Sequence, residues 1–259
     1  MQTQAQFEVA TELGTIRGEC HEPTVNSIYA TVQIVHGYFS SHRVGPNRLY
    51  VELARLLCEA GFIVIRADAL GVGESDGDFE QTSFGSELRD ALTVHQFISA
   101  RYSTFQHIVI GHSLGANVAL RMTSESKNIS MVVPISPVLM GHGGISNLFS
   151  AAQMSELMQS GQTVRKGLLV RRELFNDWQM NDAVTLAKSV RVPIRVFQGK
   201  ADQFYAPCGA QELIEGEIDG KCCLIAEADH NFLNTSGRKD LYRIIKDELV
   251  SHFSRPNPP

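Results

Sequence analysis

Residues 111–115 read G-H-S-L-G and place a serine hydroxyl between two glycines. The apolar run QHIVI leads directly into this segment, and LGANVALRMTS, with apolar residues at helical spacing, leads out of it. In such a strand–turn–helix setting the turn is so sharp that the flanking positions must be glycine. The serine is presented at a helix N-terminus, where main-chain N–H groups favour developing negative charge. The context predicts that Ser113 is a nucleophile rather than an idle serine in a glycine-rich turn.

A serine hydroxyl is a poor nucleophile until a base removes its proton, and the base needs a partner that fixes its tautomer. Asp202 follows the predicted strand PIRVFQG, and His230 follows the predicted strand KCCLIA. The carboxyl ends of parallel strands share one edge of a sheet, so both side chains should emerge beside Ser113. We predict that His230 is the general base and Asp202 its orienting acid. Asp229 adds a second carboxylate, but consecutive side chains tend to point apart.

The elements that must position these residues alternate between strands and helices. Segments 7–12 and 15–20 flank a Leu-Gly turn and predict an antiparallel hairpin. Predicted strands then cover 29–36, 62–67, 107–111, 129–135, 193–199 and 221–226, and predicted helices cover 48–59, 83–100, 114–124, 207–215 and 237–253. Strands and helices of these lengths predict right-handed βαβ units around a mostly parallel, doubly wound sheet of the α/β class.

The alternation lapses between residues 137 and 188, which contain several glycines among short apolar helical pieces. We expect residues 1–136 and 189–259 to form one α/β core and residues 137–188 to form a cap insertion. Its apolar residues either line an acyl pocket or attach the cap to the sheet; they are Ile145, Leu148, Phe149, Leu157, Met158, Leu168, Leu169, Leu174, Phe175, Trp178 and Met180. Four cationic residues of the same segment, Arg165, Lys166, Arg171 and Arg172, form either a solvated face or an anchor for an anionic part of the substrate.

Composition excludes several classes of function. The chain has 259 residues, 43% of them hydrophobic and 20% charged, as is typical of one globular domain. A net charge of −5 offers no attraction to nucleic acid or to an anionic membrane. Five scattered cysteines predict free thiols in a reducing compartment, and neither ligand spacing for a metal nor a dinucleotide motif is present. Without a signal peptide or a long apolar run, we expect a cytoplasmic protein with no membrane span and no cofactor.

The combined motifs resemble the α/β-hydrolase superfamily, most closely its small-cap serine esterases and monoacylglycerol-lipase-like serine hydrolases. The matching segments are I-V-H-G-Y at 34–38, D-A-L-G-V-G-E-S at 68–75, G-H-S-L-G at 111–115, G-K-A-D at 199–202 and A-D-H-N-F at 228–232. This sequence departs from the family at Ala116 and Asp229, where glycine is common.

The resemblance also implies roles for individual residues. The main-chain N–H groups of Leu114 and Tyr38 would form the oxyanion hole. His36 would order the loop after its strand, while His112 would merely precede the serine. The 68–75 loop would be structural.

These features predict a serine hydrolase that cleaves a carboxylic ester with a small-to-medium apolar acyl group through an acyl-enzyme on Ser113. The expected partner is a small-molecule ester or thioester. An acyl-thioesterase or an acyltransferase would use the same triad, and peptide hydrolysis also occurs on this fold. A non-catalytic ligand-binding protein on the same scaffold is less favoured, because all three triad candidates are present. Dehalogenases and epoxide hydrolases of this fold use an aspartate where Ser113 stands.

Overall fold

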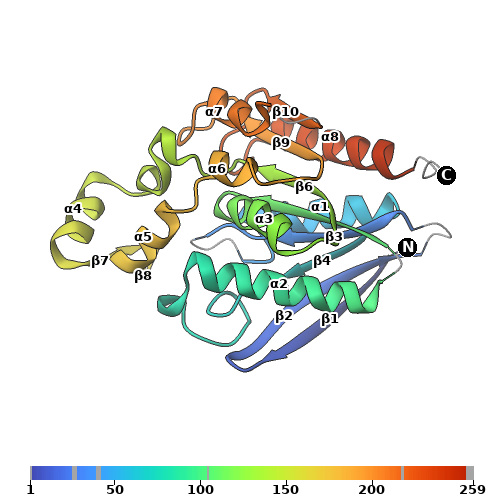
Figure 1. Ribbon diagram of the computed structural model, residues 1–259, viewed down its shortest axis with the longest axis horizontal. Helices are drawn as coiled ribbons and strands as arrows, with labels where there is room; N and C mark the ends of the chain where they lie inside the picture. The colour runs from blue at the N-terminus through green and yellow to red at the C-terminus, as the bar shows by residue number, and fades with distance from the viewer. Residues whose placement is uncertain (1, 25–27, 39–41, 104, 217–218, 255–259) are drawn as a thin grey trace.

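The structure is a computed structural model that describes residues 2–24, 28–38, 42–103, 105–216 and 219–254. Within these residues, eight strands form one sheet in the order β1-β2-β4-β3-β5-β6-β9-β10 (Figure 1). The strands are β1 (Gln2–Thr11), β2 (Gly14–Pro23), β3 (Ala30–Val35), β4 (Ile63–Ala67), β5 (Gln106–His112), β6 (Ile129–Ile135), β9 (Ile194–Gly199) and β10 (Gly220–Ile225). β1 pairs with β2 and β2 with β4 in antiparallel fashion, and every other pair is parallel. The predicted sheet and its N-terminal hairpin are confirmed.

Helices cover both faces of this sheet. The long helices are α1 (Leu49–Glu59), α2 (Phe84–Arg101), α3 (Leu114–Glu125) and α8 (Thr235–Phe253). α1 and α8 pack on one face, and α2 and α3 pack on the other (Figure 1). The centre of β5 is apolar because it is buried on both faces: Ile108 and Ile110 face the first pair of helices, and Val109 faces the second. A parallel strand buried on both faces has no polar side to alternate with.

Local signals set the ends of the helices. Ser83 and Ser86 form a reciprocal capping box at the start of α2. Gly61, with φ of 105°, follows the end of α1, where a left-handed glycine is favoured. Asn234 caps α8, which therefore begins at Thr235, two residues before the predicted start. The helix predicted over 207–215 is instead a short helix, α7 (Pro207–Gln211), followed by the 3₁₀ turn η5 (Glu212–Ile214).

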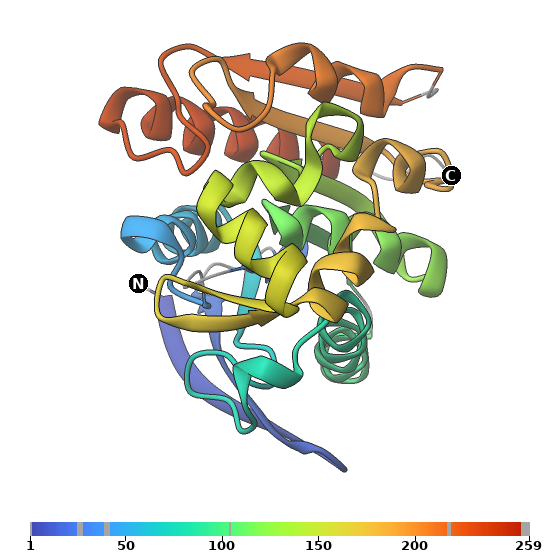
Figure 2. The same cartoon turned by 90° about the vertical axis from the view of Figure 1, so that its left-hand side faces the viewer.

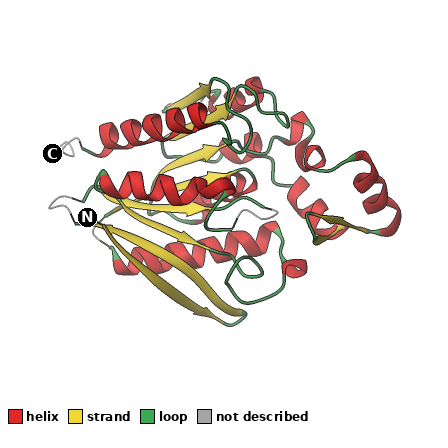
Figure 3. Cartoon of the chain, turned by 180° about the vertical axis from the view of Figure 1, so that it is seen from behind, coloured by secondary structure: helices red, strands yellow, loops and turns green. Residues whose placement is uncertain are grey.

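Residues 137–188, here called the cap segment, connect β6 to its sheet neighbour β9. The segment contains η3 (Met140–His142), η4 (Gly144–Leu148), α4 (Ala151–Ser160), β7 (Gln162–Arg165), β8 (Leu168–Arg171), α5 (Arg172–Gln179) and α6 (Ala183–Ala187). The sequence predicted helical pieces only, so the two-stranded sheet of β7 and β8 is a difference (Figure 3). Most of the segment protrudes at the end of the molecule opposite both chain ends, and Figure 2 shows it in front of the sheet.

Candidate active site

The nucleophile candidate lies in the turn between β5 and α3. Ser113 has φ of 55°, a left-handed conformation that a non-glycine residue rarely adopts. A Cβ at Gly111 would lie 2.2 Å from the main-chain oxygen of Gly115, and a Cβ at Gly115 would lie 2.1 Å from that of His36. The Ser113 N–H donates to the Ile135 carbonyl at 2.9 Å, which ties the turn to the end of β6. Both glycines are therefore required by close approach of the backbone.

The His230 side chain connects the serine to a carboxylate. Its Nε2 lies 2.9 Å from Ser113 Oγ, and its Nδ1 lies 2.7 Å from Asp202 Oδ2. The imidazole is 3% exposed. The rings of Phe204 and Tyr205 lie 5.1 and 5.6 Å from the imidazole, measured between centroids. The structure thus brings together the three residues that the sequence singled out, in the geometry by which a base accepts the serine proton.

Asp202 is bound through both of its carboxylate oxygens. Oδ1 accepts the main-chain N–H groups of Phe204 at 2.7 Å and Tyr205 at 3.2 Å, while Oδ2 accepts from Gln198 Nε2 at 2.6 Å as well as from His230. Burial by itself raises the pKa of Asp202. The hydrogen bond and the charge of His230, with the two main-chain donors, outweigh that effect and hold the pKa below its usual value. The carboxylate is therefore ionised and correctly oriented at neutral pH.

Asp229 has a different role. Its Oδ1 accepts the main-chain N–H groups of Asn231 and Leu233, both at 3.0 Å, and so shapes the loop that carries His230. An aspartate that closes a local turn in this way is common at loop positions. Between the two candidate carboxylates, the one that bonds the imidazole is Asp202.

The two oxyanion-hole candidates lie on adjoining segments. Leu114 is the first residue of α3, so its N–H has no partner within the helix, and the helix dipole favours negative charge there. Tyr38 follows β3, and the backbone at His36, two residues earlier, touches the α3 backbone at Gly115. This contact brings the loop after β3 against the start of α3, where a second donor is needed.

His36 and His112 fasten neighbouring loops. His36 Nε2 accepts the Ala69 N–H at 3.0 Å, which joins the loops after β3 and β4. His112 does more than precede the serine, because Nδ1 contacts Tyr50 Oη at 2.8 Å and Nε2 lies 3.0 Å from the His230 carbonyl oxygen. Burial lowers the pKa of His112 to about 3, so the ring is neutral. The sequence offered no signal for this support or for the bond from Gln198, since both depend on the fold.

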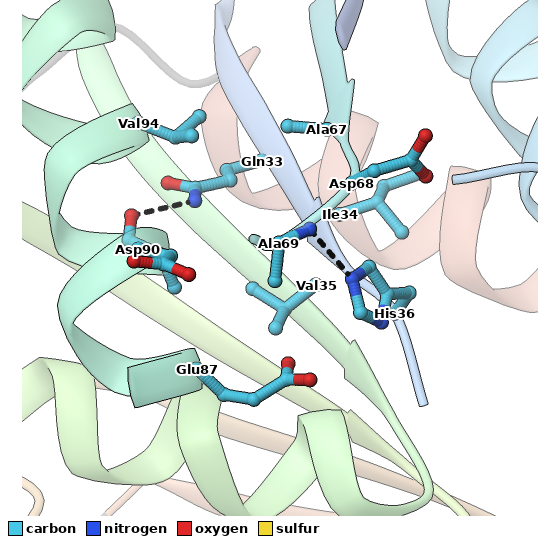
Figure 4. A pocket seen from close by; sticks show the side chains of 11 residues that line it. Gln33, Ile34, Val35, His36, Ala67, Asp68, Ala69, Glu87, Asp90 and Val94 are labelled. Carbon is cyan, nitrogen blue, oxygen red and sulfur yellow. Dashed lines mark hydrogen bonds between the residues drawn. The ribbon is translucent and has the colours of Figure 1, made fainter. Parts of the chain in front are cut away.

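A buried carboxyl group lies behind the loop after β3. Glu87 of α2 extends toward Val35 and His36 and lines a cavity of about 20 Å³ (Figure 4). Burial raises the pKa of Glu87 to about 7, and the charge of Asp90 adds to the effect while His36 opposes it. Gln33, also on this cavity, donates to the Ala91 carbonyl at 2.9 Å. The cavity is just large enough for a single water molecule.

The first turns of the cap segment bind the loop that carries the acid. Tyr205 Oη donates to the Gly144 carbonyl at 2.9 Å, and Asn147 Nδ2 donates to the Phe204 carbonyl at 2.7 Å. Since Phe204 and Tyr205 also donate to Asp202, the start of the cap segment and the acid are parts of one hydrogen-bonded unit.

Three of the four cationic residues of the cap segment have partners within the protein. Arg171 pairs with Glu80 at 2.9 Å, and Arg172 donates to the carbonyls of Leu157 and Met158 near the end of α4. Arg165 lies over the Phe149 ring, 5.2 Å from its centroid. The large apolar residues of the segment are mostly buried; Met158, Val164 and Met180, 47%, 54% and 84% exposed, are exceptions.

No group of three or more metal-ligating side chains lies together among the described residues. In the same part of the chain, no helix has the length and apolar character to cross a membrane.

Known proteins agree with this arrangement. Residues 26–179 match the family described as serine aminopeptidase, S33. This is more than half of the chain, and the chain belongs to this family, whose fold is that of the α/β-hydrolases. Est1E from Butyrivibrio proteoclasticus, solved with ferulic acid bound, has a TM-score of 0.78 at 18% identity, covering 96% of this chain and 100% of that one. The α/β-hydrolase domain-containing protein 10 from mouse has a TM-score of 0.76 at 16% identity, covering 96% and 99%.

Curated relatives include esterases and lipases. Esterase EstD of Thermotoga maritima is 24% identical over 244 residues, which are 85% of this chain and 58% of that protein. Human monoglyceride lipase is 30% identical over 107 residues, 40% of this chain and 35% of that protein. The chain thus spans less than two thirds of the length of these relatives. Together they support the predicted branch of esterase-like and lipase-like α/β-hydrolases.

Proposed function

We propose that this protein is a serine hydrolase that cleaves carboxylic esters with a small-to-medium apolar acyl group. The observation that carries the proposal is a continuous chain of hydrogen bonds. Ser113 Oγ lies 2.9 Å from His230 Nε2, and His230 Nδ1 lies 2.7 Å from Asp202 Oδ2. A nucleophile, a base and an orienting acid in this geometry are the machinery of acyl transfer. The esterase and lipase relatives add support.

In the first half of the reaction, Ser113 Oγ attacks the ester carbonyl carbon while His230 Nε2 takes the hydroxyl proton. The tetrahedral oxyanion accepts the main-chain N–H groups of Leu114 and Tyr38. Asp202 stabilises the imidazolium, which then protonates the leaving alcohol as the ester C–O bond breaks. In the second half, His230 takes a proton from water, the hydroxide attacks the acyl-enzyme, and the carboxylic acid leaves as the proton returns to Ser113.

The apolar acyl group is supported by the surroundings of the site. Ile145, Leu148 and Phe149 of the cap segment belong to the same buried apolar cluster as Leu114 and Tyr38. An acyl chain that extends from the serine toward the cap segment therefore meets apolar surface. We also propose that residues 137–188 act as a cap over the core formed by 1–136 and 189–259. We also propose a cytoplasmic location, which the five free cysteines support.

Labelling tests the nucleophile. A fluorophosphonate should modify the wild type once, at Ser113, and Ser113→Ala should lose labelling and turnover while keeping the wild-type melting temperature. Peptide mapping that places the label on another serine would contradict the assignment.

A substrate panel tests the reaction class. p-Nitrophenyl acetate, butyrate, octanoate and palmitate should be compared with the acyl-CoA thioesters of the same acids and with aminoacyl p-nitroanilides. We expect the largest kcat/KM among the short and medium esters. Higher kcat/KM on thioesters would favour the acyl-thioesterase alternative, and higher kcat/KM on anilides would favour the peptidase activity for which the family is named.

A further inference from the structure

The Tyr38 side chain is held on several sides. Its hydroxyl bonds Thr82 Oγ1, and because that hydroxyl donates to the Phe79 carbonyl at 2.7 Å, Tyr38 is the donor to Thr82. The Tyr38 ring lies 5.1 Å from the Phe79 ring and 5.3 Å from the Trp178 ring, the latter in an edge-on arrangement. Only 8% of Tyr38 is exposed. These contacts come from two segments remote in sequence, η2 (Phe79–Gln81) with Thr82, and the cap segment.

Trp178 is in turn fixed by the core. It is fully buried and lies edge-on to Phe84 at 5.1 Å. Asp177, its neighbour on α5, accepts the main-chain N–H groups of Phe84 at 2.7 Å and Gly85 at 3.4 Å. These donors belong to the first turn of α2, where N–H groups lack helical partners. Figure 2 shows α5 beside this end of α2. The end of the cap segment, the start of α2 and Tyr38 therefore pack as one unit.

The position of this side chain matters because the Tyr38 N–H is the second oxyanion donor. The preceding backbone is already fastened: Gly37 N–H donates to Tyr50 Oη at 3.1 Å, and the Gly37 carbonyl accepts from His36 Nδ1 at 2.8 Å. The contacts of the Tyr38 side chain with Thr82, Phe79 and Trp178 then hold this residue further. An oxyanion donor must be held to within about 0.5 Å of its productive position.

We propose that Thr82 and Trp178 are positioning residues for the oxyanion hole: they hold the Tyr38 side chain and thereby its main-chain N–H. This inference rests on the proposed function. The cap segment then acts on the chemistry through Trp178, whatever contacts it makes with substrate. An oxyanion is bound more tightly than the ground-state carbonyl, so loss of this support lowers kcat and leaves KM nearly unchanged.

The hydroxyl pair supplies the sharpest test. Tyr38→Phe removes the donor, Thr82→Val removes the acceptor, and the double variant removes both. Complete loss of an oxyanion donor costs about 10²–10³-fold in kcat, so a displaced donor should cost about 10-fold to 100-fold. We expect each single variant to fall in this range with KM changed less than about twofold. The double variant should match the singles, because both remove the same bond.

A second readout reports the oxyanion hole directly. Binding of a trifluoromethyl ketone, which forms a tetrahedral oxyanion on the serine, should weaken by the same factor as kcat. The matched control is Thr163→Val. Thr163 is a buried threonine of the cap segment, and its hydroxyl donates to Glu156 at 2.5 Å rather than to Tyr38 or Thr82. It should change neither kcat nor ketone binding. Trp178→Phe, which retains a ring, should preserve most of the kcat that Trp178→Ala loses.

The outcomes separate two failures. A wild type that a fluorophosphonate does not label refutes the proposed function, and the inference with it. A labelled wild type with full kcat and ketone affinity in Thr82→Val and Tyr38→Phe refutes the inference alone. So does an equal loss in Thr163→Val, or a loss confined to KM.

Discussion

Asp202→Asn replaces the carboxylate oxygen that accepts from His230 Nδ1 with an amide NH₂ group of nearly the same size. Oδ1 accepts two main-chain N–H groups, from Phe204 and Tyr205, so an asparagine must keep its carbonyl oxygen there. Its NH₂ group then occupies the place of Oδ2, 2.7 Å from His230 Nδ1. An amide donates to that nitrogen, which forces the proton onto Nε2 and removes the lone pair that faces Ser113 Oγ.

The loss in turnover follows from the wrong tautomer. In serine proteases the histidine has the same two partners, an aspartate at Nδ1 and the serine at Nε2, and the same change there costs about 10⁴-fold in kcat. We expect a loss of about 10³–10⁴-fold here, or about 4–5.5 kcal/mol in activation free energy. Folding should survive, because Gln198 can turn its amide so that Oε1, a buried acceptor with no partner among the described residues, receives the new NH₂ group.

Asp229→Asn is the matched control. Its Oδ1 accepts two main-chain N–H groups, and the asparagine oxygen accepts them equally well, so kcat should fall less than about threefold. Both variants would be assayed on one p-nitrophenyl ester at a pH where the wild type is fully active. Fluorophosphonate titration of the wild type sets the enzyme concentration scale, and circular dichroism verifies folding. A larger loss for Asp229→Asn would transfer the acid role to Asp229, and a loss below about tenfold for Asp202→Asn would refute the tautomer argument.

Three further predictions concern metals and pH. Turnover should survive exhaustive EDTA treatment because the reacting groups are all side chains; activity lost and then restored by a divalent ion would overturn this. Burial raises the pKa of Glu87 to about 7 in the folded protein. As pH rises from about 4.5 to 7, this carboxyl therefore loses its proton in the unfolded state first, and the free energy of unfolding falls. Urea unfolding should show Glu87→Gln gaining about 2.5 kcal/mol relative to wild type between pH 5 and pH 8, and an unchanged difference would contradict it. His95 is buried with its pKa lowered to about 4, so the unfolded state binds a proton first and stability falls as pH drops below about 6.5. His95→Phe should therefore gain about 2 kcal/mol relative to wild type between pH 7 and pH 5, and parallel pH curves would refute this.

The triad was predictable because each member lies next to a strand with an unmistakable apolar pattern. Ser113, Asp202 and His230 all follow the carboxyl ends of parallel strands, and the topology of the sheet then brings them together. The supporting bonds were not predictable. His112 reaches the His230 carbonyl across 118 positions of sequence, and only the packed structure shows that contact.

The hairpin of the cap segment was missed for a different reason. Its apolar residues are too few to distinguish a period of two from a helical period. A signal was present in Lys166 and Gly167, which stand between two runs of apolar and β-branched residues. Both have positive φ, 49° and 80°, as a tight two-residue hairpin turn requires. Lysine is not a typical residue for the first of these positions, which weakened the signal.

The attachment of the cap segment at both of its ends has a consequence for how this protein can diverge or be re-engineered. The first turns hold the acid loop through Gly144 and Asn147, and α5 holds the start of α2 through Asp177. The intervening residues 151–171 join two points that the core already fixes in space. A transplanted cap from another hydrolase should therefore replace only that middle stretch, so that the catalytic geometry is inherited intact.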